Sequence, residues 1–184
     1  MHLFDKPGSE NTDAVLKLAR KRGEELGIST CIVASCRGRT AQKAVNLMEG
    51  FRIVAVTHCT GFREPNFQEL PDEDRSRLEQ AGVRVITAAH AFGALGRAVR
   101  NKLNTYQIDE IAAYTLRIFG HGTKVAVEIA LMAADAGLVP VGEPVLSVGG
   151  TGEGADTAVV LLPANTHTFF DLKVREIICK PAAW

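Results

Sequence analysis

The sequence predicts an α/β protein with three layers, in which a mostly parallel sheet of about five strands, its last strand antiparallel, lies between helices. Two observations support this fold class. Continuous aliphatic runs such as RIVAVT (residues 52–57) are typical of strands buried on both faces, and they alternate with segments of helical periodicity. The 184 residues, 46% hydrophobic and 23% charged, suit one globular domain over residues 1–184, with no linker or internal repeat.

Helix and strand signals alternate through the first half of the chain. Asn11 or Thr12 can cap a helix that ends near Gly27. A strand is expected over residues 30–34, and Thr40 then caps a second helix with an apolar stripe. After the strand over residues 52–57 and a long polar loop, we expect a helix over residues 72–81 and a strand over residues 83–86.

The second half is richer in helix. Helical periodicity covers residues 90–103, 108–118 and 123–136. Two strands are then expected, over residues 144–148 and 157–162. The glycine-rich link between these strands is too short for a crossover helix, so they should be antiparallel neighbours. The tail over residues 173–179 is expected to add an edge strand.

Charge and composition exclude several classes of partner. The chain has 21 basic and 21 acidic residues, so no global field attracts nucleic acid or an anionic membrane, and electrostatic recognition must be local. The first residues lack the profile of a signal peptide, and no apolar run has the length of a membrane span, so we expect a cytoplasmic protein. The four cysteines form no C-x-x-C pair, and no metal site is expected.

The loop that follows the strand expected over residues 30–34 concentrates positive charge at the start of a helix. It consists of Ser35, Cys36, Arg37, Gly38, Arg39 and Thr40. A helix N-terminus presents unpaired N–H groups and a partial positive charge, and arginines pair well with phosphate. The loop therefore indicates a phosphate site. The alternative is an ordinary turn in which Thr40 is only a cap and the arginines are solvated.

A second loop, THCTGFREPNF (residues 57–67), contains both hydroxyl and aromatic side chains. The site candidates in it are Thr57, His58, Thr60, Gly61 and Phe62. Phe62 and Phe67 could flank a planar ligand that the hydroxyls orient, or they could anchor the loop to the core. His58 and Cys59 should not form a thiolate–imidazole pair, because neighbours in an extended chain point to opposite faces.

Two glycine-containing turns complete the candidate site. GHGTK (residues 120–124) supplies Gly122 and Thr123 and is either a second anion-binding helix start or a plain connection. GGTGEGAD (residues 149–156) supplies the site candidates Gly150, Thr151 and Gly152. The glycines of this stretch let a ligand lie against the backbone. Glu153 and Asp156 are acid–base candidates, although acidic residues in such turns are more commonly solvated. Catalytic residues stay unknown, because no known catalytic constellation has convincing spacing.

The order of these motifs resembles the C-terminal domain of pyruvate kinase. The stretch TCIVASCRGRTAQKAVNLMEGFRIVAVT is similar to that domain's strand, Gly-Arg-Ser/Thr-Ala phosphate loop, helix and second strand. AGLVPVGEPVLSVGGTGEGADTAVVL resembles its final strand pair. Pyruvate kinase chemistry belongs to a separate barrel domain, so the resemblance implies no pyruvate kinase activity here.

A closer resemblance is to a small family of free-standing microbial and archaeal proteins with this fold. THCTGF, GHGTKVAVEIALMAADAGLVP and GGTGEGADTAVVLLPANTHTFFDLKVREII carry it. That family has no established activity and is associated with flavin mononucleotide (FMN). The resemblance implies FMN as cofactor, with residues 35–40 at the phosphate and His58, Thr60, Gly61 and Phe62 at the ribityl chain or ring. A flavin-dependent oxidoreductase, a non-catalytic sensor of a phosphorylated metabolite and a purely structural assembly module all stay open. The apolar helix faces and the resemblance to a domain of pyruvate kinase, a tetrameric enzyme, indicate a possible homo-oligomer.

Overall fold

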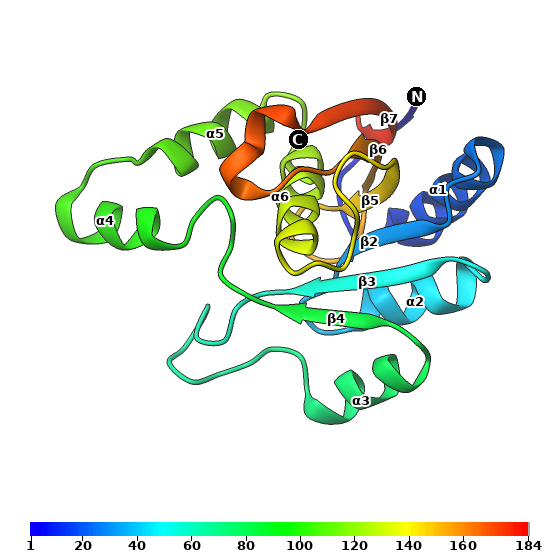
Figure 1. Cartoon of the computed structure of the whole chain (residues 1–184), viewed down its shortest axis with the longest axis horizontal. Helices are drawn as coiled ribbons and strands as arrows, with labels where there is room; N and C mark the ends of the chain where they lie inside the picture. The colour runs from blue at the N-terminus through cyan, green and yellow to red at the C-terminus, as the bar shows by residue number, and fades with distance from the viewer. Residues whose placement is uncertain (184) are drawn as a thin grey trace.

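A computed structural model describes residues 1–183, and within them seven strands form one sheet in the order β1-β7-β6-β5-β2-β3-β4 (Figure 1). The strands are His2–Phe4 (β1), Thr30–Ala34 (β2), Arg52–Thr57 (β3), Arg84–Thr87 (β4), Val145–Gly149 (β5), Thr157–Leu162 (β6) and Lys173–Pro181 (β7). β2 lies beside β3 and β5 and is parallel to both, and β4 is parallel to β3. β6 is antiparallel to its neighbours β5 and β7.

The predicted fold class and the antiparallel pairing of β5 with β6 are therefore confirmed, but the ends of the chain differ from the prediction. β7 is not an edge strand, because β1 pairs with it in parallel, His2 opposite Cys179 and Phe4 opposite Pro181. The strand count of about five becomes seven among the described residues. A three-residue strand such as β1 is too short to show periodicity, so only its pairing reveals it.

Helices cover both faces of the sheet. They are Thr12–Leu26 (α1), Arg39–Leu47 (α2), Asp72–Gln80 (α3), Leu95–Leu103 (α4), Ile108–Arg117 (α5) and His121–Asp135 (α6), with short 3-10 helices at Ser9–Asn11 (η1) and Thr166–Asp171 (η2). α1, α2 and α3 pack on one face and α6 on the other, and α5 packs against α6 (Figure 1). α4 lies beyond α5, at the periphery of the fold.

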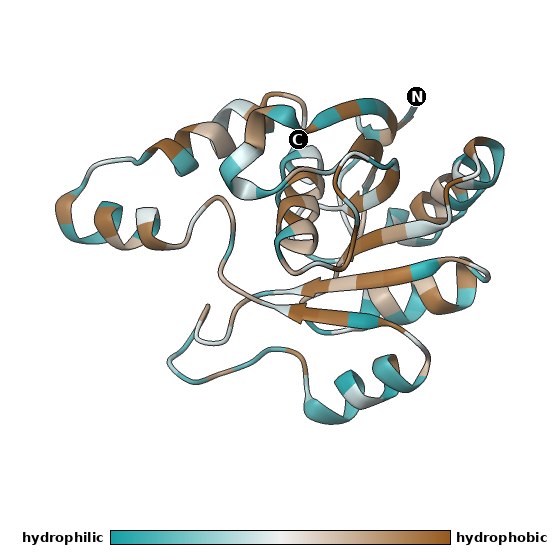
Figure 2. Cartoon of the chain, viewed as in Figure 1, coloured by the Kyte–Doolittle hydropathy of each residue, from teal (hydrophilic) through white to brown (hydrophobic). Residues whose placement is uncertain are grey.

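Alternation along the central strands divides the core into two layers. In β2, Cys31 and Val33 pack with residues of α1 and α2, whereas Ile32 packs with α6. The strands are accordingly hydrophobic on both faces, while α3 is largely hydrophilic (Figure 2). α6 is buried along most of its length, which explains its almost continuous apolar sequence.

One predicted helix boundary is wrong. The helix expected from residue 90 begins only at Leu95, because the preceding segment turns into the structure instead of continuing the helix. Phe92 is buried there against Val127 and Leu131 of α6, and its N–H donates to Glu128 Oε1 at 3.0 Å. In residues 1–183 no helix combines the length and apolar character that a membrane span requires.

Candidate functional site

A cavity of about 610 Å³ lies at the carboxyl ends of β2 and β3, and we call it the cleft. Its walls come from the loops that follow these strands, from α4, α5 and α6, and from the β5–β6 loop. Open α/β sheets bind ligands at this edge, and the volume is typical of a site for a small molecule. The sequence prediction that the loops after β2 and β3 and the β5–β6 loop share one site therefore agrees with their placement around a single cavity.

The start of α2 forms one end of the cleft. Ser35 Oγ accepts a hydrogen bond from Ala41 N–H at 3.0 Å and so caps the helix. Gly38 is the N-cap residue, with φ of 81°, and Thr40 lies inside the helix. The prediction that Thr40 is the cap is wrong, because the serine side chain reaches the helix start from the end of β2. A helix start leaves its first N–H groups without intrahelical partners, and Arg37 and Arg39 beside this helix start line the cleft.

Basic side chains outnumber acidic ones around the cleft. Among the residues described, its basic lining is Arg37, Arg39, Lys43, Arg63, Arg97, Arg117 and Lys124, against the carboxylates of Glu69, Glu128 and Glu153. The whole chain has a net charge of zero, so this excess of cations is a local feature. Cations that converge on a cavity beside a helix N-terminus favour an anionic ligand.

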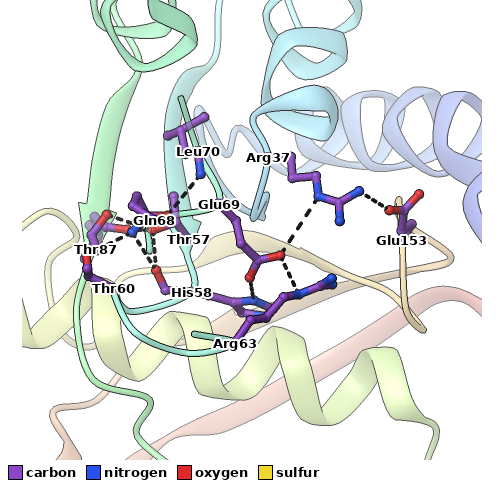
Figure 3. A network of polar contacts seen from close by, with 11 residues as sticks. Arg37, Thr57, His58, Thr60, Arg63, Gln68, Glu69, Leu70, Thr87 and Glu153 are labelled. Atoms are coloured by element: carbon purple, nitrogen blue, oxygen red, sulfur yellow. Dashed lines mark hydrogen bonds and ion pairs between the residues drawn. The ribbon is translucent and has the colours of Figure 1, made fainter. Parts of the chain in front are cut away.

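A buried carboxylate holds the loop after β3 in place. The Glu69 side chain is 4% exposed. Its Oε2 is hydrogen-bonded to His58 Nδ1 at 2.5 Å, and its Oε1 forms ion pairs with Arg63 Nε at 2.9 Å and Arg37 Nε at 3.9 Å (Figure 3). Gln68 Nε2 also donates to the backbone oxygen of His58 at 3.2 Å. With Nδ1 held by Glu69, the imidazole of His58 has a defined orientation beside the cleft.

An ion pair crosses the mouth of the cleft from the β2–α2 loop to the β5–β6 loop. Arg37 Nη1 lies 2.8 Å from Glu153 Oε1 (Figure 3). Arg39 Nη1 lies 3.9 Å from Glu153 Oε2. These side chains are 41%, 75% and 62% exposed for Arg37, Arg39 and Glu153. Ion pairs this exposed contribute little to stability, so an incoming anion can compete with Glu153 for the arginines.

Aromatic rings form a second region of the wall. Phe62 lies 4.0 Å from His58 and 5.0 Å from His90 between ring centroids, and it stacks on His90 with an interplanar angle of 29°. The guanidinium of Arg97 lies 5.2 Å from the centre of the Phe62 ring. Burial lowers the pKa of His90 to about 4, so its ring is neutral near pH 7. Flat neutral rings suit contact with a planar ligand.

An apolar surface of α6 completes this end of the cleft with Val125, Ile129 and Met132. Phe62 therefore lies at the cleft and not in the core, while Phe67 is 49% exposed and anchors nothing to the core. The alternative in which both phenylalanines hold the loop to the core is wrong.

Ten of the residues predicted from sequence line the cleft. They are Ser35, Cys36, Arg37, Arg39, Thr40, Thr57, His58, Phe62, Gly150 and Gly152. Burial raises the pKa of the Cys36 thiol to about 11, so this cysteine is protonated at neutral pH and is no ready nucleophile. Thr57 Oγ1 lies 2.7 Å from Thr87 Oγ1 and joins the ends of β3 and β4.

Six predicted residues do not line the cleft. They are Gly38, Thr60, Gly61, Gly122, Thr123 and Thr151. Gly122 is a packing residue, because a Cβ there would lie 2.2 Å from Thr157 Oγ1 of β6. Thr123 is buried and donates to the backbone oxygen of Phe119 at 3.2 Å. The GHGTK turn therefore brings α6 close to the sheet.

Asp156 is a structural anchor and not a solvated turn residue. It is fully buried and accepts hydrogen bonds from Thr151 N–H at 3.0 Å, Gly8 N–H at 3.3 Å and the hydroxyl of Thr157 at 2.8 Å. These bonds hold the base of the β5–β6 loop to the N-terminal segment, while exposed Glu153 lies near the tip of the loop.

Sequence reasoning missed the cleft residues His90, Arg97, Lys124 and Glu128. A signal was present for two of them, because Lys124 and Glu128 interrupt an otherwise apolar helix at a spacing of four residues. His90 and Arg97 carry no local signal, since they reach the cleft only through the turn before α4. In residues 1–183 no group of three or more His, Cys, Asp or Glu side chains could hold a metal ion.

Comparison with known proteins shows the family. The family described as "Pyruvate kinase, alpha/beta domain" matches residues 13–161. Among solved structures, the chain is similar to the crystal structure of Cryptosporidium parvum pyruvate kinase, with 13% identity and a TM-score of 0.42. That similarity covers 86% of this chain and 23% of the pyruvate kinase chain, so this chain spans less than a third of that protein. Because the family match extends over most of the sequence, the chain belongs to the pyruvate kinase alpha/beta domain family.

Proposed function

We propose that the cleft binds flavin mononucleotide. One observation carries the proposal: a single cavity joins a basic helix start, suited to a phosphate, with aromatic and apolar walls, suited to a planar ring. A phosphate site alone would not need the rings of His58, Phe62 and His90, and a site for an uncharged ring would not need the arginines.

The residues around the cleft fit the two ends of such a ligand. The phosphate would meet the N-terminus of α2 with Arg37 and Arg39, once they leave Glu153, and with Lys43, once it leaves Asp13. The ring would lie against Phe62 and the apolar side chains of α6. His58, held by Glu69, would lie between these regions at the carboxyl end of β3.

Bound FMN would supply the electron or hydride transfer of a flavin-dependent oxidoreductase, and the protein would supply position and electrostatics. The chain's own residues do this by binding the anion, orienting the ring and keeping a neutral imidazole, His90, beside it. The absence of an evident acid–base dyad in the sequence is compatible with such a division of roles.

The first experiment is a visible absorption spectrum of purified protein before and after FMN is added and unbound ligand is removed by desalting. About one flavin retained per chain supports the proposal. Riboflavin, which lacks the phosphate, should bind about 100-fold more weakly, because two or more charge-assisted contacts are lost. Equal affinity for FMN and riboflavin would show that the basic end does not hold the phosphate.

If no flavin is retained, the proposal fails. A thermal-shift screen of sugar phosphates then tests the second reading, a sensor of a phosphorylated metabolite, which the excess of cations at the cleft favours. A rise in melting temperature with such a compound and no flavin binding would establish that alternative.

A further inference from the structure

A buried ion pair lies within the wall of the cleft. Lys124 and Glu128 are one turn apart on α6, with side chains 8% and 7% exposed, and the lysine ammonium donates to Glu128 Oε2. The other carboxylate oxygen accepts the N–H of Phe92 at 3.0 Å. Both side chains line the cleft. The pair is thus held from two sides, by its own helix and by the turn before α4.

The apolar surroundings give the charge of Lys124 no structural role beyond its ion pair with Glu128, whose carboxylate also accepts the N–H of Phe92. The neighbouring positions of α6 are Ala126, Val127, Ile129 and Ala130, all buried apolar residues. Desolvation of two charges commonly exceeds their attraction, so replacing a buried pair by apolar residues is often neutral or stabilising. A pair that breaks the apolar pattern of a core helix beside a cavity is therefore a candidate for function.

The ammonium has donor capacity to spare. It carries three N–H donors, and within residues 1–183 it donates to a single acceptor, the Glu128 carboxylate. Nζ also lies 5.8 Å from the centre of the Phe92 ring. Burial lowers the pKa of Lys124 and the charge of Glu128 opposes this, so an added acceptor would stabilise the charged form.

We propose that Lys124 recognises an electron-rich acceptor on the edge of the ligand's planar ring, a carbonyl oxygen or a ring nitrogen, and that Glu128 positions the lysine for this contact. The inference rests on the proposed function and deepens it, because it assigns a polar subsite to the ring end of the cleft. Lys124 then contacts the ring, whereas Arg39 and Lys43 contact the phosphate.

A comparison of FMN with riboflavin in two variants tests this division. Lys124→Met should weaken both ligands by the same factor, about tenfold, because both carry the ring. Lys43→Met, the matched control at the start of α2, should weaken FMN and leave riboflavin unchanged. Fluorescence titration measures the affinities. If Lys124→Met affects FMN alone, or neither ligand, the inference is overturned.

Two further steps keep the test decisive. Because Lys124→Met leaves Glu128 buried and unpaired, the variant Lys124→Met with Glu128→Gln removes both charges while Gln Oε1 can still accept the N–H of Phe92. Circular dichroism and the melting temperature report whether each variant is folded. The double variant should show the same equal loss for FMN and riboflavin, and unchanged ring affinity in the folded double variant would overturn the inference.

A probe that does not require flavin binding separates this inference from the proposed function. Pyridoxal 5′-phosphate is a phosphorylated planar ring with an aldehyde at its edge. Its carbonyl carbon forms a C=N bond with Nζ as water leaves, and borohydride reduces the imine to a stable amine that peptide mass spectrometry locates. Labelling of Lys124 in a protein that retains no FMN would support the inference and refute the proposed function. Labelling confined to other lysines would overturn the inference itself.

Discussion

The two ends of the cleft hold charge in opposite ways. At the mouth, Arg37, Arg39 and Glu153 form an ion pair network whose members are 41%, 75% and 62% exposed. In the wall, Lys124 and Glu128 are 8% and 7% exposed. Water and salt screen the exposed charges at the mouth, so the arginines can leave Glu153 for another partner. Lys124 and Glu128 have little contact with solvent, so water does not replace a lost partner there. The mouth is suited to admit an anion, and the wall is suited to hold a fixed donor.

The largest expected effect comes from breaking the buried pair. Lys124→Met should reduce the free energy of unfolding by about 3–5 kcal/mol, because it leaves the Glu128 carboxylate buried without its counter-charge. Urea unfolding followed by circular dichroism measures the change. The double variant with Glu128→Gln should regain most of the loss, and equal stability of the single and double variants would contradict this view of the pair.

Acidification should act on the ring end of the cleft through His90. Its pKa is lowered to about 4 in the fold, chiefly by burial, against an ordinary value of 6.5. The unfolded chain therefore binds a proton that the folded chain does not as the pH falls from about 6.5 to about 4, and this group's stability contribution is lost over that window. The loss can reach about 3–4 kcal/mol.

Unfolding free energies at several pH values between 7 and 4 test this prediction. His90→Gln, which cannot titrate, is the control and should flatten the pH dependence over that window. An identical slope in the variant would show that other groups cause it.

Two carboxylates of the β5–β6 loop should differ in their effect on stability. Asp156→Asn should reduce the free energy of unfolding by about 2 kcal/mol, because a buried carboxylate that accepts three hydrogen bonds loses the charge that strengthens them. Glu153→Gln should change it by less than about 0.5 kcal/mol. Thermal unfolding of both variants is the measurement. A comparable loss in Glu153→Gln would mean that the ion pair at the mouth contributes to stability and is not easily replaced by another anion.

The smallest expected effect concerns ligand affinity. Glu153→Gln releases Arg37 for the phosphate and should strengthen FMN binding up to about fivefold, since an exposed ion pair contributes about 0–1 kcal/mol. The gain should shrink as salt is added, because screening already weakens the ion pair that the substitution removes. Titration at low and high ionic strength measures it. Weaker binding in Glu153→Gln would indicate that Glu153 supports the ligand instead of competing with it.

Much of the fold was predictable because its signals are local. The aliphatic run of β3 and the short link between β5 and β6 identify a sheet with one antiparallel step. The clustering of the loops at residues 35–40 and 57–67 was also predictable, since parallel strands end at one edge. The strand β1 was missed because three residues give no periodicity.

Individual site residues were less predictable. Gly38 and Gly122 were expected at the ligand-binding site. In the structure Gly38 has φ of 81° and a Cβ there would lie 2.9 Å from Leu70 Cδ1, and Gly122 lies against Thr157. Gly38 therefore serves packing and backbone conformation, and Gly122 serves packing. Residue type alone does not tell a ligand contact from a close contact within the protein.

The sequence by itself determined the α/β class, the antiparallel step between β5 and β6 and the concentration of arginines at the start of α2, because periodicity, link length and composition are properties of neighbouring residues. The tertiary structure decided which charges face one cavity. Arg37 and Glu69, Arg37 and Glu153, and Phe92 and Glu128 come from distant segments, and only packing brings each pair together and sets its burial. The difference between the two groups of charges is their burial. The exposed arginines at the mouth can change partners because water solvates them, whereas the buried Lys124 and Glu128 depend on each other because a charge is costly to hold away from water.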